Sequence, residues 1–407
     1  MKCRHCTAEL DIEFLDLGHA PPSNAYLRAE DLSKPEVTYP LRVLACASCW
    51  LVQTEDYADA GALFSADYAY FSSTSKGWLT HAATYCKMIT QRLGLDASSL
   101  VVELASNDGY LLRNFVAAGV PCLGIEPTRS TAEAAEVRGI PVRQEFFGAD
   151  VGRRMADAGE RADLVIGNNV YAHVPDINGF TQGVAALLKD DGVVTFEFPH
   201  LLRLIQETQF DTVYHEHFSY LSLGAVAAIF SAAGLRVFDV EELPTHGGSL
   251  RVYGCRQGAG HEATEAVHRV LQAEIAGGLQ QADTYRSFQA RANRVKDDLV
   301  RFLLDAKTTG KSVAGYGAAA KGNTLMNYAG IRPDLMPFVC DAAPAKIGQY
   351  LPGSHIPILP PSALTEQRPD YLVILPWNIA EEVMKQNAAL AELGTRFVVA
   401  VPEIRVL

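Results

Sequence analysis

Two separate stretches of the chain alternate strand-like apolar runs with segments of helix length, and this alternation constrains the fold most strongly. Between residues 100 and 199 the apolar runs are LVVEL, VPCLGIEP, DLVIGNN and VVTFEFP. Between residues 312 and 402 they are SVAGYG, MPFVCD, YLVILP and RFVVAVP. Such alternation is typical of parallel sheets covered by helices, so the sequence predicts two α/β domains.

The composition limits the class of partner. The chain has 407 residues, of which 48% are hydrophobic and 20% charged, enough for two or three domains. A formal net charge of −12 disfavours a surface that binds many nucleic-acid phosphates. The N-terminus lacks an apolar secretory segment, and the apolar run 218–235 contains several serines and glycines, which favours a buried helix over a membrane span. We expect a cytoplasmic protein without a nucleic-acid or membrane partner.

Four of the eight cysteines form two C-x2-C pairs, Cys3 with Cys6 and Cys46 with Cys49. Each pair presents two thiolates from one tight turn, and two pairs complete the tetrahedral donor set that zinc prefers. Because sulfur fills all four positions, we predict a structural zinc ion rather than a catalytic one. Ordinary buried cysteines and a redox pair are the alternatives.

The first α/β stretch has a ligand-binding pattern at its strand-to-helix turn, where small side chains allow a ligand close to the backbone. Glu126 ends the next strand, where an acidic side chain can accept hydrogen bonds from ribose hydroxyls. The turn lacks the three glycines of a dinucleotide fingerprint, so S-adenosylmethionine fits better than NAD. A generic α/β turn with a solvated Glu126 is the alternative. The candidate cofactor-binding residues of the turn are Glu103, Ala105, Ser106, Asn107 and Asp108.

Polar residues elsewhere extend this candidate cofactor site. Asn168 and Asn169 end another strand of the same stretch. Polar side chains at the carboxyl end of a strand line the crevice in which α/β domains bind ligands. Upstream, the segment DYAYFSSTSKGW brings aromatic side chains next to Ser72 and Lys76 and is compatible with a lid over the cofactor. A hydrophobic seam between two domains is the alternative.

The run Tyr214-His215-Glu216-His217 contains the strongest acid–base candidates. An extended run puts Tyr214 and Glu216 on one face and the two histidines on the other, whereas a turn brings all four together. Histidine accepts a proton near neutral pH, and tyrosine can donate to a developing enolate oxygen. These residues therefore suit proton abstraction next to a carbonyl. A two-histidine metal site and a polar helix entry are the alternatives.

The second α/β stretch has an anion-binding pattern, in which a Gly-x-Gly turn follows a strand and opens a lysine-containing helix. This arrangement is typical of a phosphate-binding loop. We predict that this domain holds the nucleotide diphosphate of a substrate; a domain that only buttresses the first is the alternative. The candidate substrate-binding residues are Gly315, Gly317, Lys321, Asn323, Asp341 and, from the segment HGGSLR, Arg251.

The order of these motifs along the chain resembles a known family. The two C-x2-C pairs precede YAYFSSTS, VVELASNDGYLL, NNVYAHVPD, FEFPH, VYHEHFSY and THGGSLRVY. Over essentially the whole chain, this order resembles the S-adenosylmethionine-dependent sugar C-methyltransferases that act at C-3′ of dTDP-linked keto sugars, such as those of the tetronitrose and kijanose type. VYHEHFSY is the most specific motif. The chain departs from the family at Ala105, where glycine is usual.

The resemblance implies the fold and its domains. It implies a class I methyltransferase core of Rossmann-like α/β type, preceded by a zinc-binding module and followed by a second Rossmann-like α/β domain. The implied boundaries are 1–70 for the zinc-binding module, 71–255 for the methyltransferase domain and 256–407 for the nucleotide-sugar-binding domain.

The resemblance also implies residue roles. The catalytic base falls on His217, with Glu216 and Tyr214 beside it, and Tyr68 and His173 fall on the family's other active-site positions. The implied cofactors are S-adenosylmethionine and a structural Zn2+ ion held by the four paired cysteines. The implied partner is a nucleotide-linked keto sugar, with dTDP as the carrier, and we expect a monomer or a small homo-oligomer.

Two other classes remain as alternatives at this point. An NAD-dependent nucleotide-sugar oxidoreductase accounts for the two α/β stretches but not for the paired cysteines. A zinc-ribbon nucleic-acid binder requires a basic surface, which the net charge of −12 opposes.

Overall fold

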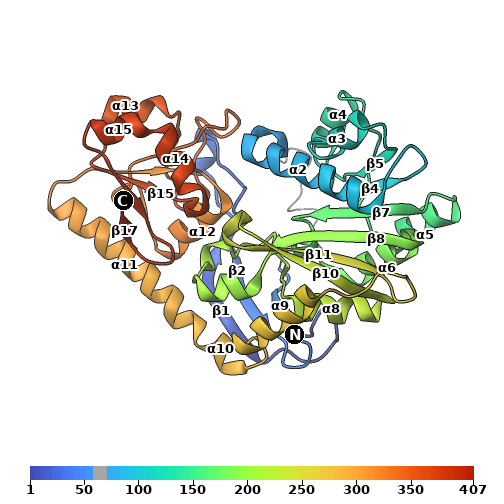
Figure 1. Cartoon of the computed structure of the whole chain (residues 1–407). Coiled ribbons are helices and arrows are strands. Elements are labelled where there is room, and N and C mark those ends of the chain that lie inside the picture. The colour runs from blue at the N-terminus through green and yellow to red at the C-terminus, as the bar shows by residue number, and fades with distance from the viewer. Residues whose placement is uncertain (58–70) are drawn as a thin grey trace.

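The computed structural model describes residues 1–57 and 71–407, and three β-sheets organise this part of the chain (Figure 1). A seven-stranded sheet and a six-stranded sheet form the two large lobes, and a four-stranded sheet lies where the lobes meet. The two larger sheets confirm the α/β fold class. No helix in the described ranges is long and apolar enough to cross a membrane.

The seven-stranded sheet has the strand order β10-β11-β8-β7-β4-β5-β6. The strands from β8 to β6 run parallel, whereas β11 is antiparallel to both of its neighbours. The sequence predicted the buried strands β4, β5, β7 and β8 but not the final pair β10 and β11. The strands are β4 (Val101–Leu104), β5 (Cys122–Ile125), β6 (Val142–Arg143), β7 (Ala162–Asn168), β8 (Leu188–Pro199), β10 (Leu235–Leu243) and β11 (Ser249–Arg256).

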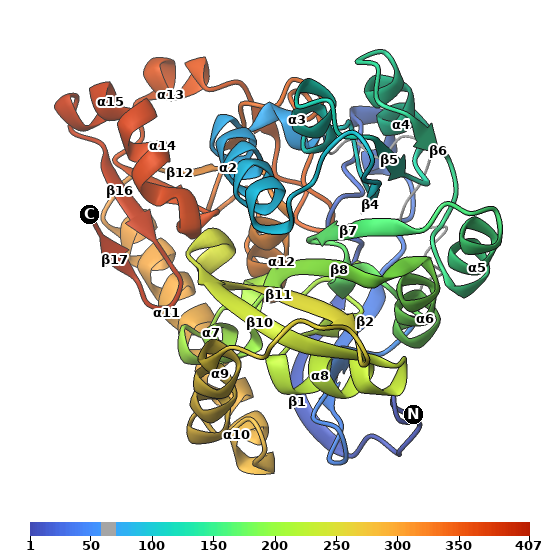
Figure 2. The same ribbon diagram turned by 45° about the vertical axis from the view of Figure 1, so that its right-hand side comes forward.

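Helices cover both faces of this sheet because successive strand residues point to opposite sides (Figure 2). Val101 packs in the cluster with α2 and α3, whereas Val102 packs in the cluster with α5, α6, α8 and α9. The helices of this lobe are α2 (Lys76–Leu93), α3 (Leu112–Ala117), α4 (Arg129–Glu136), α5 (Ala149–Asp157), α6 (Ile177–Leu187), α8 (Leu223–Ala232) and α9 (Glu265–Ala276), whereas α7 (Leu201–Gln206) packs in the core of the four-stranded sheet.

The six-stranded sheet confirms the second α/β stretch. Its order is β14-β13-β12-β15-β16-β17, and all strands are parallel except β17 at the edge. The strands are β12 (Val313–Tyr316), β13 (Val339–Cys340), β14 (Ile358–Leu359), β15 (Tyr371–Ile374), β16 (Arg396–Val399) and β17 (Arg405–Val406). The accompanying helices are α12 (Ala320–Tyr328), α13 (Ser362–Gln367), α14 (Ala380–Gln386) and α15 (Ala388–Glu392).

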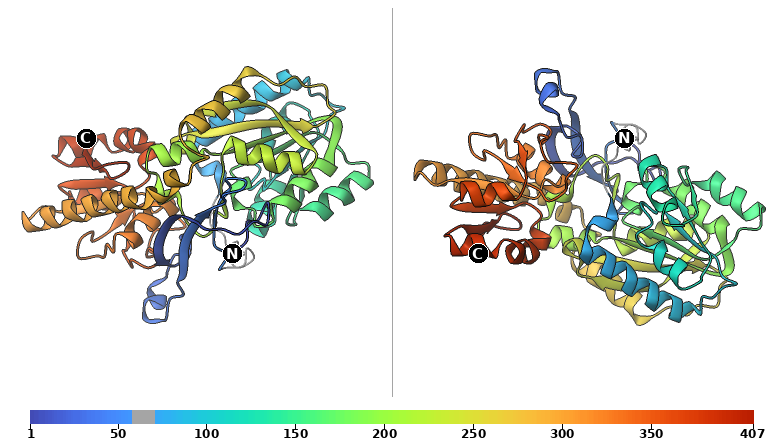
Figure 3. Two further views of the ribbon diagram at one scale, coloured as in Figure 1. Left: turned by 90° about the horizontal axis from the view of Figure 1, so that it is seen from below. Right: turned by 90° about the horizontal axis from the view of Figure 1, so that it is seen from above.

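The four-stranded sheet connects the two lobes. It is antiparallel, and its last strand comes from the methyltransferase-like stretch. The helices α10 (Ala282–Arg286) and α11 (Phe288–Thr308) pack on it, and the ring of Phe14 stacks on Phe288 with 4.5 Å between centroids. The loop between β1 and β2 projects from the body of the molecule (Figure 3). The strands are β1 (Ile12–Ala20), β2 (Tyr39–Ala45), β3 (Val52–Thr54) and β9 (Ser219–Tyr220).

The crossing of α5 and α6 depends on two glycines. A Cβ atom added at Gly152 would lie 2.2 Å from the backbone oxygen of Gly183. Because this clash is with the backbone, no side-chain rotation can relieve it. We therefore expect Gly152→Ala to lower the free energy of unfolding by about 1–3 kcal/mol, measured by denaturant titration. Arg153→Ala, on the exposed face of α5, is the control, with an expected change within about 0.5 kcal/mol. Equal stability of the Gly152 variant and the wild type would contradict this packing.

Candidate active site

The segment 212–218, here called the catalytic turn, adopts the turn form of the two conformations that the sequence left open. The short helix η4 (Phe210–Thr212) leads into it, and the backbone N–H of His217 donates to the carbonyl of Tyr214 at 2.9 Å. The His215 side chain lies apart from those of Tyr214, Glu216 and His217. Its Nε2 lies 3.3 and 3.2 Å from the carbonyl oxygens of Tyr39 and Pro40. The other three members of the run remain together.

Side chains from three different parts of the fold hold the catalytic turn. From β3, the Thr54 hydroxyl donates to the carbonyl of His217 at 3.1 Å. From α12, the Thr324 hydroxyl donates to the carbonyl of Val213 at 2.8 Å. From the loop after β1, the Asn24 amide donates to Glu216 Oε1 at 2.7 Å. The turn is therefore fixed both by the four-stranded sheet with its β1–β2 loop and by the lobe of the six-stranded sheet.

His217 is oriented as a base. Its Nδ1 lies 2.9 Å from the carbonyl oxygen of Thr212. A carbonyl can only accept, so Nδ1 carries the proton and Nε2 carries the lone pair of the neutral ring. Burial lowers the pKa of His217 well below its usual range, and the nearby His173, Lys321 and His246 add to this effect. The ring is therefore neutral near pH 7.

Aromatic rings surround His217. The ring of Tyr214 lies 3.9 Å from it and that of His173 lies 4.6 Å from it, measured between centroids. His173 belongs to the short helix η3 (Tyr171–His173) and bonds to the backbone of Glu216, while burial lowers the pKa of His173 to about 4. The structure thus brings together four of the five predicted catalytic residues. The fifth, Tyr68, lies outside the described residues.

The strand-to-helix turn after β4 has an unusual backbone. Ala105 and Asn107 have φ values of 54° and 50°, in the left-handed region that favours glycine. The Glu126 carboxylate accepts the backbone N–H groups of Asn107 and Thr128, each at 2.8 Å. The backbone N–H of Ser72 donates to the Asn107 side chain at 2.9 Å. These contacts place Ser72, Asn107 and Glu126 in one cluster at the carboxyl ends of β4 and β5.

Buried charge and unpaired polar groups mark the same edge of the sheet. Burial, together with Glu126 and Asp108, raises the pKa of Glu103. Asp108 pairs with Arg138 at 3.0 Å. Within the described ranges, the Ser106 hydroxyl and both polar atoms of the Asn168 amide are buried without a hydrogen-bond partner. Such groups are usually satisfied by a ligand or by water, so this cradle fits a polar cofactor.

The remaining cofactor candidates lie at the margins of this cradle. Asn169 follows β7 with φ at 53°, and its amide lies 3.3 Å from Nε2 of His246. His246 therefore joins the site; it lies in the motif THGGSLRVY, from which the sequence analysis selected only Arg251 as a candidate. Lys76 is exposed at the first position of α2.

In the lobe of the six-stranded sheet, here called the second lobe, three of the candidate substrate-binding residues make contacts within the protein. Asp341 accepts the backbone N–H groups of Ala318 and Ala343 at 2.7 and 2.8 Å. Asn323 donates to the carbonyl of Ser23 at 2.5 Å, which ties α12 to the loop that carries Asn24. Gly315 packs tightly, because an added Cβ would lie 2.8 Å from the Met336 sulfur. The following three candidates therefore have contacts within the protein: Gly315, Asn323 and Asp341.

Gly317 packs against Pro376, whose Cδ would lie 2.5 Å from an added Cβ, whereas Lys321 lies near the histidines of the first lobe. Gly317 has φ at 92°, which the turn before α12 requires and other residues rarely adopt. Lys321, in the first turn of α12, lies close enough to His217 and His246 for its charge to lower the pKa of both.

Arg251 lies in a different environment from the one expected. It is 4% exposed and pairs with Glu197 at 2.8 Å and with Glu241 at 3.1 Å. These carboxylates are its cross-strand neighbours on β8 and β10, because Arg251 belongs to the unexpected strand β11. Its charge is balanced inside the sheet, so the structure does not bring it to the phosphate-binding loop as expected.

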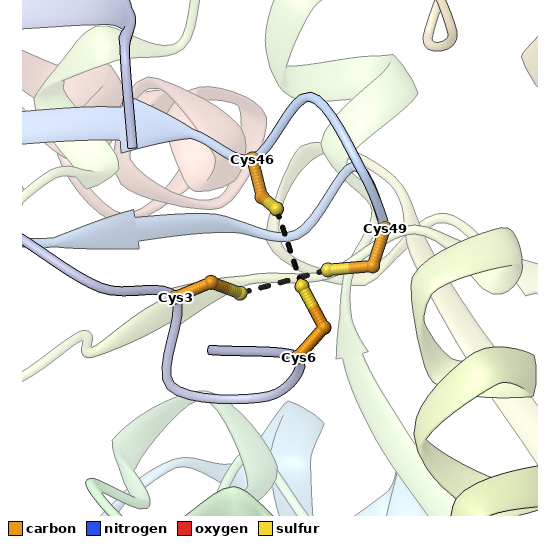
Figure 4. Close-up of side chains that lie close together, drawn as sticks. All are labelled: Cys3, Cys6, Cys46 and Cys49. Carbon is orange, nitrogen blue, oxygen red and sulfur yellow. Dashed lines mark hydrogen bonds between the residues drawn. The ribbon is translucent and has the colours of Figure 1, made fainter. Parts of the chain in front are cut away.

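The four paired cysteines converge on one point (Figure 4). Their sulfur atoms lie within 4.8 Å of one another, and the Cys3–Cys49 and Cys6–Cys46 sulfur distances are 3.6 and 3.5 Å. A tetrahedral zinc ion with Zn–S bonds near 2.3 Å requires sulfur separations of about 3.8 Å. The Gln53 amide and the Ser48 backbone N–H also point at cluster sulfurs, at 3.3 and 3.4 Å. The donor set fits a closed, structural zinc site.

Comparison with known proteins agrees with this geometry. Family models match three successive parts of the chain: a putative zinc binding domain at residues 3–64, a methyltransferase domain at 78–240 and a C-methyltransferase C-terminal domain at 244–402. The fold and the site thus define an S-adenosylmethionine-dependent methyltransferase with a zinc-binding domain. The chain is 37% identical over 406 residues to the C-methyltransferase NovU of Streptomyces niveus, covering 100% of this chain and 96% of that protein. The chain belongs to this C-methyltransferase family.

Solved structures are similar to part of the chain. A S-adenosylmethionine-dependent methyltransferase from Clostridium acetobutylicum has a TM-score of 0.36 and 10% identity, over 44% of this chain and 92% of that one. Magnesium protoporphyrin IX methyltransferase from Synechocystis, with bound S-adenosylmethionine, has a TM-score of 0.33 and 15% identity, over 44% of this chain and 81% of that one.

The zinc cluster can be tested by removing one ligand. We expect Cys46→Ser to reduce bound zinc from about one ion per chain to a small fraction, and to lower the unfolding temperature, because a closed four-sulfur site contributes directly to folding. Metal content is measured by mass spectrometry and unfolding by calorimetry. Cys255→Ser, which removes a buried cysteine of β11 outside the cluster, is the control and should retain zinc. Full zinc content in the Cys46 variant would refute the assignment.

Proposed function

We propose that the protein transfers a methyl group to C-3 of a dTDP-linked 4-keto-deoxysugar through an enolate. The observation that carries this proposal is the orientation of His217, whose Nδ1 is held by the carbonyl of Thr212. The imidazole therefore presents its basic nitrogen, Nε2, to the buried site. The family assignment supports carbon as the methyl acceptor.

A hydrogen next to a keto group is only weakly acidic, so its removal needs two groups. A base must lie within hydrogen-bond reach of the carbon, and a donor or cation must stabilise the oxygen as it gains negative charge. His217 supplies the base in this proposal. The rings of Tyr214 and His173 exclude water around it, which strengthens electrostatic interactions inside the site.

The cofactor completes the reaction. S-adenosylmethionine, when bound, supplies an electrophilic methyl group on a positively charged sulfur. The unpaired Ser106 and Asn168 groups would bind its polar parts, and Glu126 would accept its ribose hydroxyls. Positioning of the acceptor carbon by the protein makes the transfer effectively intramolecular.

The second lobe would bind the nucleotide carrier. A cavity of about 580 Å3 is lined mostly by residues of the first lobe, among them Arg203 and Gly247, and Trp377 of the second lobe closes one side of it. This volume is within the range of small-molecule sites. Such a position would keep the diphosphate outside the histidine cluster while the sugar reaches His217.

The decisive experiment uses methyl-13C-labelled S-adenosylmethionine and a panel of 4-keto nucleotide sugars. We expect the wild type to place the label on a ring carbon, seen by NMR, and His217→Asn to lower this rate by about 10²–10⁴-fold. Binding of S-adenosylhomocysteine, measured by calorimetry, should stay within twofold, because His217 acts on the acceptor.

His215→Gln is the matched control, because the imidazole of His215 lies against two backbone carbonyls of β2 and an amide can replace this hydrogen bond. We expect it to retain activity within tenfold. Label on an oxygen atom, or a His217 variant that turns over within tenfold of the wild type, would contradict the proposal.

The pH dependence follows from the environment of His217. Burial and nearby positive charge lower its pKa, so the neutral, basic form persists as the pH falls below the usual histidine value of about 6.5. We expect the acid limb of kcat/KM, which reports the free enzyme, to have its midpoint clearly below pH 6.5. A midpoint at or above pH 6.5, measured with initial rates between pH 5 and 8, would show that another group controls the reaction.

A further inference from the structure

Lys321 reaches the catalytic turn from the second lobe. Its Nζ donates to Asn378 Oδ1 at 3.1 Å and lies 4.7 Å from the ring centroid of Trp377. The indole N–H of Trp377 in turn donates to Asp211 Oδ2 at 2.8 Å. Asp211 immediately precedes Thr212, the residue whose carbonyl orients His217. Two residues of its own lobe thus hold the ammonium group, and one of them, Trp377, is hydrogen-bonded to Asp211 of the other lobe.

The charge of Lys321 acts on the same residues. It lowers the pKa of His217 and of His246, and it opposes the burial that raises the pKa of Asp211 to about 6. Its contact with Trp377, which is hydrogen-bonded to Asp211, independently places the ammonium group next to the start of the catalytic turn. It is the cation that the second lobe contributes to the histidine cluster.

Lys321 has more N–H donors than its hydrogen bonds within the described residues occupy. An ammonium group has three N–H donors. In the part of the chain that the structure describes, Asn378 is the one hydrogen-bond acceptor found for Lys321. By contrast, the ring N–H of His217 is already committed to Thr212. Lys321 therefore has donors and charge available for an oxygen atom placed beside His217.

We propose that Lys321 stabilises the enolate oxygen in the methylation reaction, rather than binding the diphosphate as its sequence context suggested. This inference rests on the proposed function. In this step His217 Nε2 takes the C-3 proton, the C–H electron pair forms the C-3=C-4 double bond, and the carbonyl π pair moves onto the C-4 oxygen. The oxygen becomes negative next to the Lys321 ammonium, and the imidazole becomes positive.

This placement favours the enolate over the ground state. Before the reaction the keto oxygen is neutral. Burial lowers the pKa of Lys321, and the nearby Asp211 opposes this effect, while the π face of Trp377 lies against the ammonium group. When the proton moves, a full negative charge forms next to the fixed cation. A contact that strengthens only as charge develops lowers the barrier instead of merely tightening substrate binding.

The test separates enolate formation from methyl transfer and from binding. The wild type, Lys321→Met and Lys321→Arg are each incubated in D2O with S-adenosylhomocysteine and the dTDP-linked 4-keto sugar that the wild type methylates best. Exchange of deuterium into C-3 is followed by NMR at increasing substrate concentration. Lys311→Met removes a surface lysine of the same lobe, paired with Asp370, and serves as the control for lost charge. Calorimetric unfolding checks that each variant is folded.

We expect Lys321→Met to lower the exchange rate at saturating substrate by about 10²–10³-fold, as for loss of one oxyanion donor. Lys321→Arg should retain most of the exchange because it retains the cation, and Lys311→Met should match the wild type. A Lys321→Met enzyme with normal saturated exchange but a raised half-saturation concentration would overturn the inference and assign Lys321 to the diphosphate. Loss of exchange in Lys321→Arg equal to that in Lys321→Met would also overturn it, because position rather than charge would then matter. Absence of exchange in the wild type itself would refute the proposed function.

Discussion

The hydrogen bond between His217 Nδ1 and the carbonyl of Thr212 determines the chemistry available to this protein. It fixes the tautomer of the ring, so that the basic lone pair lies on Nε2. It also requires residues 212–217 to form a turn, since an extended chain would carry the two groups apart. The arrangement of the three sheets can be understood from this requirement, because a short turn with few contacts of its own needs support from its surroundings.

That support comes from two parts of the chain that are distant from the turn in sequence. The zinc-binding part provides Thr54 and Asn24, and the second lobe provides Thr324. The zinc cluster therefore stabilises more than a small separate domain, because Cys3 and Cys46 lie in the same hydrophobic core as the seven-stranded sheet. Disorder in this part would release both β3 and the loop that contacts Glu216.

Sequence alone predicted the features that depend on local pattern. The alternation of apolar runs predicted both α/β sheets, and the cysteine spacing predicted the metal cluster. It could not decide between an extended run and a turn at Tyr214–His217, because partners distant in sequence, such as Thr324, decide this. Asn24 lies in a loop without a motif, so no local signal marked it. Arg251 was assigned to a phosphate because its strand was not recognised, and both of its carboxylate partners lie on neighbouring strands.

The most direct test of this account is the protonation state of the His217 ring, measured by 15N NMR on the folded protein with His217→Asn used to assign the signal. The account predicts, at neutral pH, a neutral ring with the proton on Nδ1 and an unprotonated Nε2, together with a pKa below 6.5 on titration. A ring protonated on Nε2, or a doubly protonated imidazolium at pH 7, would contradict it. In either case Nε2 would have no lone pair with which to accept a proton from carbon.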